Sequence, residues 1–284
     1  MLEKFSSQTI DNCKFFIYQH CLMLNTAPHI LCEESNVKKE FKKSKAWFAH
    51  FITEYDVGKE TSWWYCIKDE RYDVGNFKAK NRYEINKGRK NFFVQEITPE
   101  PYDRELLDLD IQKFSDYPKA YKPTLSEIEK SLKERIFLNK NNKWFGLFDK
   151  GNEKLCGYGV VGENGVCINL NVVTIDSSTY KRNSSVALID GILTFYDNYA
   201  GGGCYLCDGA RNVKHITNYQ EFLISNFNFR KVYCKAKFIC KWWVKPILFI
   251  ALPFKKLLLK SNKKLFYNLG CILRLKKYAN LSIK

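Results

Sequence analysis

The chain of 284 residues lacks acidic side chains at its C-terminal end. No Asp or Glu follows Glu221, while the last 63 residues carry 15 Lys and Arg. The first 221 residues hold 31 basic and 30 acidic residues, so the net charge of +16 lies almost wholly in the C-terminal segment. This asymmetry favours a polyanionic partner, either an anionic lipid surface or a nucleic acid.

Proline and glycine are also scarce, with 7 and 15 residues, whereas 45% of the chain is hydrophobic. This composition excludes a disordered protein, because so apolar a chain buries enough surface to offset the conformational entropy lost on folding. The length is compatible with two domains or one large one.

Regular cysteine spacing is absent as well. The 11 cysteines and an N-terminus without a signal-peptide pattern indicate a protein of the reducing cytoplasm. Cys204 and Cys207 form a lone Cys-x-x-Cys pair on a predicted strand, where residues three apart point to opposite faces, so we interpret them as core residues and predict no metal site. The sequence contains no Gly-x-Ser-x-Gly, phosphate-binding loop, His-Glu-x-x-His or dinucleotide fingerprint, so the corresponding enzyme classes have no support.

Residues 1–90 are interpreted as an N-terminal extension of helices plus a strand. Trp47, Phe48, Phe51 and Tyr55 fall at helical spacing, which predicts the core face of a helix. Residues 63–67 predict a buried strand. The basic stretch 78–90 predicts a solvated helix or, alternatively, a contact with a phosphate-bearing substrate through Arg82 and Lys87.

Residues 91–240 show regular hydrophobic patterns that predict an α/β unit, a mixed sheet flanked by helices. The Asn164-Gly165 pair favours a hairpin. The predicted strands are 92–98, 143–148, 155–161, 166–175, 204–207 and 230–239, and the predicted helices are 103–114, 125–137, 184–199 and 218–226.

This order of elements resembles the GNAT superfamily of acyl-CoA N-acyltransferases. In that family a β-branched strand leads into a loop of the form [Gln/Arg]-x-x-Gly-x-[Gly/Ala], which begins a helix and holds the cofactor pyrophosphate. A helix N-terminus favours phosphate because its N–H donors are unpaired and its dipole end is positive. The resemblance therefore implies an acyl-CoA (acetyl-CoA) site formed by Val172, Val173, Arg182, Asn183, Ser184, Ser185, Val186 and Ala187. Ser185 stands where the family has Gly.

A second motif of the family is an Asn-led helix that ends in Gly-Phe before the last strand. Here the helix starts at Asn218, a further predicted cofactor contact, and ends in Asn228-Phe229. The family's Tyr general acid corresponds to Ile224, so Tyr219 and Tyr233 are the nearest substitutes.

Three polar residues follow the strand that we expect to border the cleft. His215 is the predicted general base, because an imidazole titrates near neutral pH. Arg211 suits an anionic group of the substrate, and Asp208 is either a catalytic residue or the cap of the following turn.

A narrower resemblance lies in Ser62-Trp63-Trp64, in residues 80–88, 208–215 and 228–231, and in Leu252-Pro253-Phe254. These segments are similar to GNAT-like proteins of bacterial surface-polysaccharide gene clusters, a branch related to the FemABX-like aminoacyltransferases. The resemblance implies transfer of an acyl group to an amino sugar or similar amine in glycan assembly. Two alternatives stay open: a transferase that takes aminoacyl-tRNA, and a GNAT-fold protein without catalysis that serves as a lipid-docking scaffold.

Residues 241–284 are predicted to form a basic amphipathic tail. Leu258, Leu265, Leu269 and Ile272 share one helical face, and Trp242-Trp243 at the start is typical of interfacial anchors. The longest uncharged run of this tail is nine residues, and a bilayer span needs about 20. We therefore predict peripheral docking on the inner face of the membrane, where each Lys or Arg contributes roughly 1 kcal/mol. Binding of tRNA, or a helix packed on the body with solvated lysines, are the alternatives.

Overall fold

The computed structural model describes residues 8–10, 13–115, 117, 119–120, 122–137, 142–197, 199, 203–214 and 216–282. The chain divides into two compact units. Unit 1 contains residues 1–67, 209–221 and 230–284, and unit 2 contains residues 68–208 and 222–229. The predicted α/β class, a mixed sheet flanked by helices, is confirmed.

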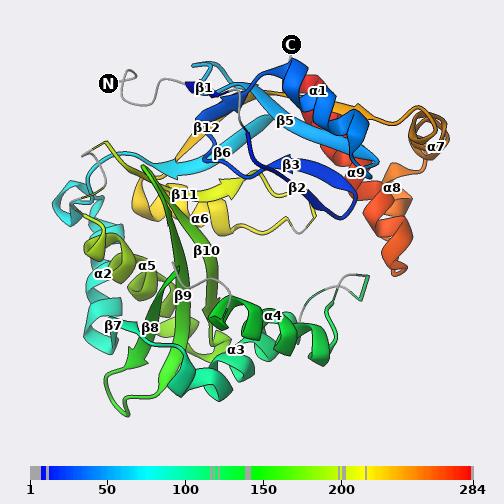
Figure 1. Ribbon diagram of the computed structural model, residues 1–284. Coiled ribbons are helices and arrows are strands. Elements are labelled where there is room, and N and C mark those ends of the chain that lie inside the picture. The colour runs from blue at the N-terminus through cyan, green and yellow to red at the C-terminus, as the bar shows by residue number, and fades with distance from the viewer. Residues whose placement is uncertain are drawn as a thin grey trace. The chain divides into compact units, whose positions relative to one another are not determined.

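Unit 2 is built on a mixed sheet with the strand order β7-β8-β9-β10-β11 (Figure 1). Its strands are β7 (Phe92–Ile97), β8 (Asn142–Asp149), β9 (Leu155–Asn164), β10 (Cys167–Ile175) and β11 (Tyr205–Ala210). The neighbours from β7 to β10 are antiparallel, whereas β10 and β11 are parallel. The predicted hairpin at Asn164-Gly165 connects β9 to β10, and Gly165 adopts the positive φ of 58° that this tight turn requires.

Helices cover both faces of this sheet. They are α2 (Ala79–Asn91), α3 (Asp103–Ser115), α4 (Leu125–Phe137) and α5 (Ser184–Phe195). Trp144 packs in one cluster with Leu106 of α3 and Leu132 of α4, while its neighbour Phe145 contacts Phe195 of α5. Because successive side chains of a strand point to opposite faces, α3 and α4 lie on one face and α5 on the other.

The predicted elements of 91–240 are present, with ends that shift by a few residues. Residues 176–183, which lie between the predicted strand 166–175 and the predicted helix 184–199, are largely a 3-10 helix, η3 (Ser177–Arg182). Three of the described elements cross the boundary between the units: β6 (Trp63–Lys68), β11 and α6 (Tyr219–Phe227). Residues of the expected 91–240 segment thus occur in both units, because β12 (Arg230–Cys240) pairs with strands of unit 1.

The strands of unit 1 pair in the order β2-β3-β5-β12-β6, in which β3 and β5 are parallel and the other neighbours are antiparallel. Besides β12 and β6, these strands are β2 (Phe15–Tyr18), β3 (Cys21–Leu24) and β5 (Phe48–Glu54). Helix α1 (Glu34–Lys43) precedes β5, and the short strands β1 (Gln8–Ile10) and β4 (Ile30–Cys32) pair with each other in parallel.

The prediction of a helix around residues 47–55 is wrong, because this segment forms strand β5. It runs between β3 and β12, and its first five residues are all buried. A strand buried on both faces loses the polar alternation that identifies strands in a sequence. The core assignment holds for Phe48, Phe51 and Tyr55, whereas Trp47 is 40% exposed.

The C-terminal segment also belongs to unit 1. It forms α7 (Val244–Ala251), α8 (Lys255–Leu258) and α9 (Lys264–Ser282). Helix α9 packs along β12, and the Ser282 hydroxyl accepts a hydrogen bond of 2.8 Å from the Ala236 N–H. The alternative in which a tail helix packs on the body therefore holds for α9. None of the helices in the described part of the chain combines the length and the apolar character that a membrane crossing requires.

Candidate active site

The candidate site of unit 2 begins where β10 and β11 separate. β10 pairs with β9 as far as Ile175, but among the described residues its pairing with β11 ends at Asn169. The register with β9 shifts between Leu170 and Val172, which marks a β-bulge. Bulges redirect a strand next to many functional sites. Val172 and Val173 therefore lie on a stretch of β10 with an open backbone edge.

A lysine from α3 occupies part of this edge. A Cβ added at Gly157 of β9 would lie 2.8 Å from the Thr174 carbonyl oxygen, so this carbonyl faces β9. Because carbonyl directions alternate along a strand, the Val173 carbonyl faces the opposite edge. There it accepts a hydrogen bond of 3.0 Å from Lys113 Nζ. Burial lowers the pKa of Lys113.

Asp110 is the centre of a buried network that holds this part of α3. The carboxylate is 1% exposed, pairs with the Arg135 guanidinium of α4, and accepts a hydrogen bond of 2.6 Å from the Tyr158 hydroxyl of β9. The Thr174 hydroxyl donates to it at 3.3 Å. Burial and the Asp110 carboxylate raise the pKa of Tyr158. The side chains of this network are too buried to contact a substrate. We therefore interpret the network as holding Lys113 in position.

Sequence reasoning missed this network, although one signal for it exists. Asp110 is a lone acid on the apolar face that Leu106 and Phe114 define in helix 103–114. A carboxylate in such a place needs a cationic partner from another element. Its partner Arg135 lies 25 residues further along the chain, and no local pattern connects the two.

The loop from Arg182 to Ala187 forms the start of α5, as the resemblance implies. Asn183 adopts a left-handed conformation with φ 65° and separates η3 from the helix. The Ala187 N–H donates to the Asn183 carbonyl at 2.9 Å. Ser184 is fully buried, and its hydroxyl has no hydrogen-bond partner. Ser185 is half-buried, and Val186 is buried.

Helix α2 packs directly against this start of α5. A Cβ added at Gly88 would lie 3.1 Å from the Asn183 carbonyl oxygen and 3.2 Å from the Ala187 nitrogen. The Asn183 side chain donates to the Glu84 carbonyl at 3.0 Å, and Lys87 Nζ donates to the Lys181 carbonyl at 3.2 Å. Glycine at position 88 permits this close approach of two helix backbones.

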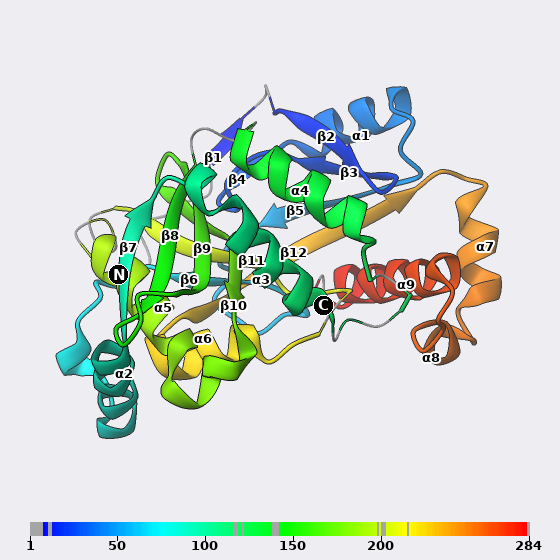
Figure 2. The ribbon, with the colours of Figure 1, turned by 90° about the horizontal axis from the view of Figure 1, so that it is seen from below.

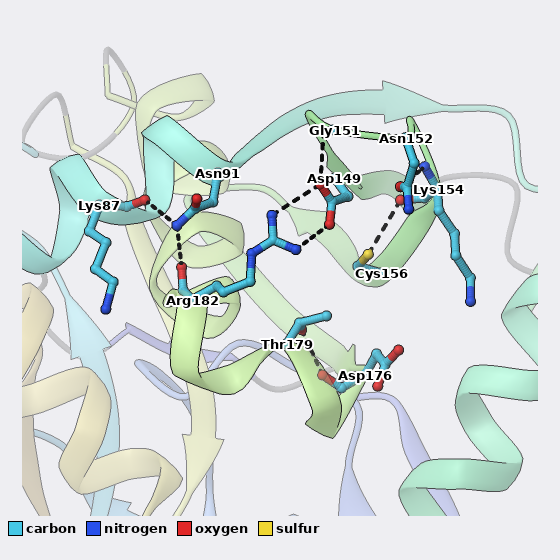
Figure 3. A network of polar contacts seen from close by, with 10 residues as sticks. All are labelled: Lys87, Asn91, Asp149, Gly151, Asn152, Lys154, Cys156, Asp176, Thr179 and Arg182. Carbon is cyan, nitrogen blue, oxygen red and sulfur yellow. Dashed lines mark hydrogen bonds and ion pairs between the residues drawn. The ribbon is translucent and has the colours of Figure 1, made fainter.

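The Arg182 guanidinium has an acidic partner inside the unit, as Figure 3 shows. It pairs with the Asp149 carboxylate at the end of β8 and lies 4.8 Å from the ring centroid of Phe92. The Arg182 guanidinium lowers the pKa of Asp149, and the Gly151 N–H, which donates to this carboxylate at 2.8 Å, adds to the effect. Any anion that binds Arg182 would share it with Asp149.

A second ion pair fastens α2 to α5. The Arg89 guanidinium donates two hydrogen bonds to the Asp190 carboxylate, at 2.7 and 2.8 Å. The Tyr72 hydroxyl donates to the same carboxylate at 2.6 Å. Burial, followed by the Asp190 carboxylate, raises the pKa of Tyr72. Arg89, interpreted from the sequence as part of a basic stretch, therefore has a structural partner.

Unit 2 brings together most of the expected cofactor contacts. Val172, Val173 and the segment 182–187 lie at the end of β10 and the start of α5, and Lys87 contacts the chain just before this segment. Arg82 donates to the Phe77 carbonyl at 2.5 Å. Asp208 is half-buried on β11.

Other expected site residues belong to unit 1. Arg211 donates to the Ser62 carbonyl at 3.1 Å, and its guanidinium lies 4.1 Å from the Tyr278 ring centroid. Tyr233 is half-buried on β12, Tyr219 begins α6, and Asn218 is exposed just before it. His215 lies outside the described residues. The described part of the chain contains no cluster of three His, Cys, Asp or Glu side chains placed to hold a metal ion.

Comparison with known proteins identifies the fold. No family model matches the chain, and neither does any curated protein. Among solved structures, FemX matches with a TM-score of 0.53 and 6% identity over 76% of this chain and 77% of FemX. A conserved protein of unknown function from Bacteroides thetaiotaomicron VPI-5482 matches at a TM-score of 0.45 and 16% identity, over 73% of this chain and 67% of that protein. L-PGS from Bacillus licheniformis matches at 0.43 and 13%, over 83% of each chain. The chain thus has a GNAT-like fold of the kind found in FemX, and the predicted resemblance in fold is confirmed.

Proposed function

We propose that this protein is a GNAT-like acyltransferase that moves an acyl group from acyl-CoA to an amine, on an amino sugar or similar acceptor, in surface-glycan assembly. The observation that carries the proposal is the open edge of β10, which continues through η3 into the start of α5. A donor with amide groups can pair with an open strand edge as an added strand. Its phosphates would then lie near the N-terminus of α5, where N–H groups and the helix dipole favour anions.

The reaction requires a base for the acceptor amine and an acid for the leaving thiolate. His215 is our candidate for the base, with Asp208 as a further catalytic residue. Tyr219 and Tyr233 are the candidates for the acid. Arg211, Arg82 and Lys87 are the candidates for binding anionic groups of the substrate.

One observation favours a second candidate, an aminoacyl-tRNA-dependent transferase of the FemABX-like kind. Helix α2 contacts the start of α5, and Arg182 pairs with Asp149, so the protein itself uses part of the expected pyrophosphate site. An aminoacyl-tRNA donor has no pyrophosphate to place there. Its backbone phosphates would instead contact exposed basic residues such as those of α2.

Titration of acetyl-CoA into the purified protein, beside a binding assay with charged tRNA, separates the two candidates. For acyl-CoA we expect micromolar binding that Arg182→Ala weakens about tenfold, because a charge-assisted contact contributes roughly 1.5 to 3 kcal/mol. Ser185→Gly should strengthen binding, since it removes a side chain from the backbone that faces the phosphates. Arg104→Ala, an exposed arginine on α3, is the matched control.

Binding of charged tRNA without acetyl-CoA binding would favour the second candidate. Binding of neither donor would contradict both and leave the non-catalytic lipid-docking scaffold.

We further propose that the enzyme works while docked on the inner face of the membrane. Large apolar side chains of the C-terminal segment are exposed, among them Trp242 at 80% and Phe249 at 78%, and no acidic residue follows Glu221. Co-sedimentation with vesicles should show binding to 30% phosphatidylglycerol and little binding to pure phosphatidylcholine. Equal binding to both vesicle types would contradict the electrostatic part of this proposal.

A further inference from the structure

The C-terminal helices of unit 1 enclose an apolar groove with a volume of about 600 Å³. Helices α7, α8 and α9 lie next to one another (Figure 2). Val244, Leu248 and Ala251 on the inner side of α7 pack with Leu273 of α9, so apolar contacts hold the helices in place. The side chains that line the groove include Ile247, Ile250, Phe254, Leu257, Phe266 and Leu269.

The lining is unusual because much of it faces solvent. Ile250 is 68% exposed and Leu257 is 70% exposed. Lys260 and Ser261 are the polar residues among those that line the groove. Its volume falls within the range of roughly 300 to 1,000 Å³ that is typical of small-molecule sites. Contiguous exposed apolar surfaces are rare on soluble proteins, and they often mark binding sites.

The surroundings of the groove are cationic. Lys260 lines it, and Lys255, Lys256, Lys263 and Lys264 flank its lining residues in the sequence. Burial, together with the charges of Lys277 and Arg274, lowers the pKa of Lys255. Like charges thus crowd around Lys255, and an anion placed there would relieve their repulsion.

We propose that the groove between α7, α8 and α9 holds one hydrocarbon chain of an anionic phospholipid, with the phosphate among Lys255, Lys260 and Lys264. The inference deepens the membrane-docking part of the proposed function, because it replaces general adsorption by a site for one lipid molecule. A hydrocarbon chain fits the lining because it has no polar groups that need partners. The cationic rim supplies the complementary charge for the phosphate.

A partner protein would be the other occupant of an apolar groove, and the charge pattern argues for the lipid. The apolar lining with a cationic rim matches a molecule that is anionic at one end and apolar at the other. The side of α7 that faces away from the groove is a separate surface. Phe249 lies about 160° around the helix axis from Ile247, given the 100° turn per residue, and it lines a different depression with Phe41 and Lys276.

Short-chain lipids test the groove in the absence of a bilayer. Calorimetric titration with dihexanoylphosphatidylglycerol, below its critical micelle concentration, should show one lipid molecule bound per protein molecule. Dihexanoylphosphatidylcholine should bind at least about fivefold more weakly, because its headgroup has no net charge. Inorganic phosphate should bind more weakly still, since it gains nothing from the apolar lining.

Variants of the groove lining and of the side of α7 that faces away from the groove distinguish the groove from general adsorption. Leu257→Asp should weaken lipid binding about tenfold or more, because it places a carboxylate in the apolar lining. Phe249→Asp, an equally exposed apolar residue on the opposite side of α7, should leave the affinity for the short-chain lipid unchanged. Lys260→Glu should weaken binding of the anionic lipid, whereas Lys150→Glu in unit 2 should not.

Several results would overturn the proposal. Equal losses for Phe249→Asp and Leu257→Asp would indicate adsorption without a lipid site. Equal affinity for the two short-chain lipids would contradict the proposed dependence on the net negative charge of the headgroup. Undiminished binding of the anionic lipid to Lys260→Glu would remove that lysine from the site.

The outcomes are independent of catalysis. If the short-chain lipid fails to bind while anionic vesicles still bind, the proposed lipid site in the groove is wrong, and the proposed membrane docking keeps its support. If the short-chain lipid binds but neither acyl donor does, the groove stands and the acyltransferase proposal fails. Far-UV circular dichroism of each variant checks that the fold is kept.

Discussion

Each unit contains both parallel and antiparallel strand pairs, but the two units bury different kinds of polar groups. In unit 2, Asp110, Asp149 and Asp190 are buried carboxylates that each pair with an arginine of another element. In unit 1, His29 and His50 are buried, and burial lowers the pKa of both imidazoles. Unit 2 thus uses directional ion pairs to fix its helices around the candidate site, whereas unit 1 buries groups that stay neutral.

The largest effect should come from removing the carboxylate of Asp110. Asp110→Ala leaves Arg135 buried without its counter-charge and Tyr158 without its acceptor, so we expect a loss of about 3 to 5 kcal/mol in the free energy of unfolding. Urea unfolding measures it, with Asp108→Ala, an exposed acid of the same helix, as the control. A loss as small as that of the control would contradict the role of Asp110.

Acid should destabilise unit 1 through His50. Burial lowers the pKa of His50 to about 4, below its ordinary value of 6.5. The unfolded chain therefore takes up this proton at a higher pH than the folded chain, and stability falls as the pH drops from about 6.5 toward 4. The shift corresponds to about 3 kcal/mol at the acid end of this window.

His50→Phe keeps a ring in this place and should remove most of that acid dependence, which unfolding at a series of pH values would show. The exposed His20 provides the control, since His20→Phe should leave the dependence in place. An unchanged pH profile in His50→Phe would assign the acid sensitivity to other groups.

Weakening the contacts to Asp190, which join α2 to α5 through Arg89, should have an intermediate effect on the free energy of unfolding. Tyr72→Phe removes one hydrogen bond from Asp190 but leaves the Arg89 ion pair, so we expect a loss of about 1 to 2 kcal/mol. Tyr83→Phe, an exposed tyrosine on α2, should change stability by less than about 0.5 kcal/mol. Equal effects of the two variants in urea unfolding would show that the Tyr72–Asp190 hydrogen bond does not stabilise the packing of α2 on α5.

The smallest effect on stability should come from Asp149→Asn, because its partner Arg182 has a 43% exposed side chain. We expect a loss of about 1 kcal/mol or less. Since Arg182 lowers the pKa of Asp149, the contribution is present above the ordinary carboxyl pKa and is lost as the pH falls through the lowered value.

The same variant sharpens the functional proposal. Asp149→Asn frees Arg182 for an anion, so the affinity for acetyl-CoA should rise several-fold in calorimetry. A lower affinity would indicate that the ion pair is needed to shape the loop.

Local patterns were enough to predict most of unit 2. Alternation and helical spacing predicted the strands and helices between residues 91 and 240, and the Asn164-Gly165 turn was identified correctly. The same reasoning failed at β5, where burial on both faces removes the periodic signal. It also divided the chain by linear segments, whereas β12 and α9 join strands from the N-terminal part in unit 1.

The amino-acid sequence by itself determined the α/β class, the order of elements between residues 91 and 240 and the concentration of positive charge after Glu221, because these depend on composition and local spacing. Tertiary structure alone decided the partners of the buried charges: Asp110 with Arg135, Asp149 with Arg182, and Asp190 with Arg89. It also decided that α9 packs on β12 while some apolar side chains, such as Phe249 of α7 and Leu257 of α8, stay exposed. These pairings join residues from 25 to 101 positions apart, and only the packing of helices on the sheet brings such residues within reach of one another.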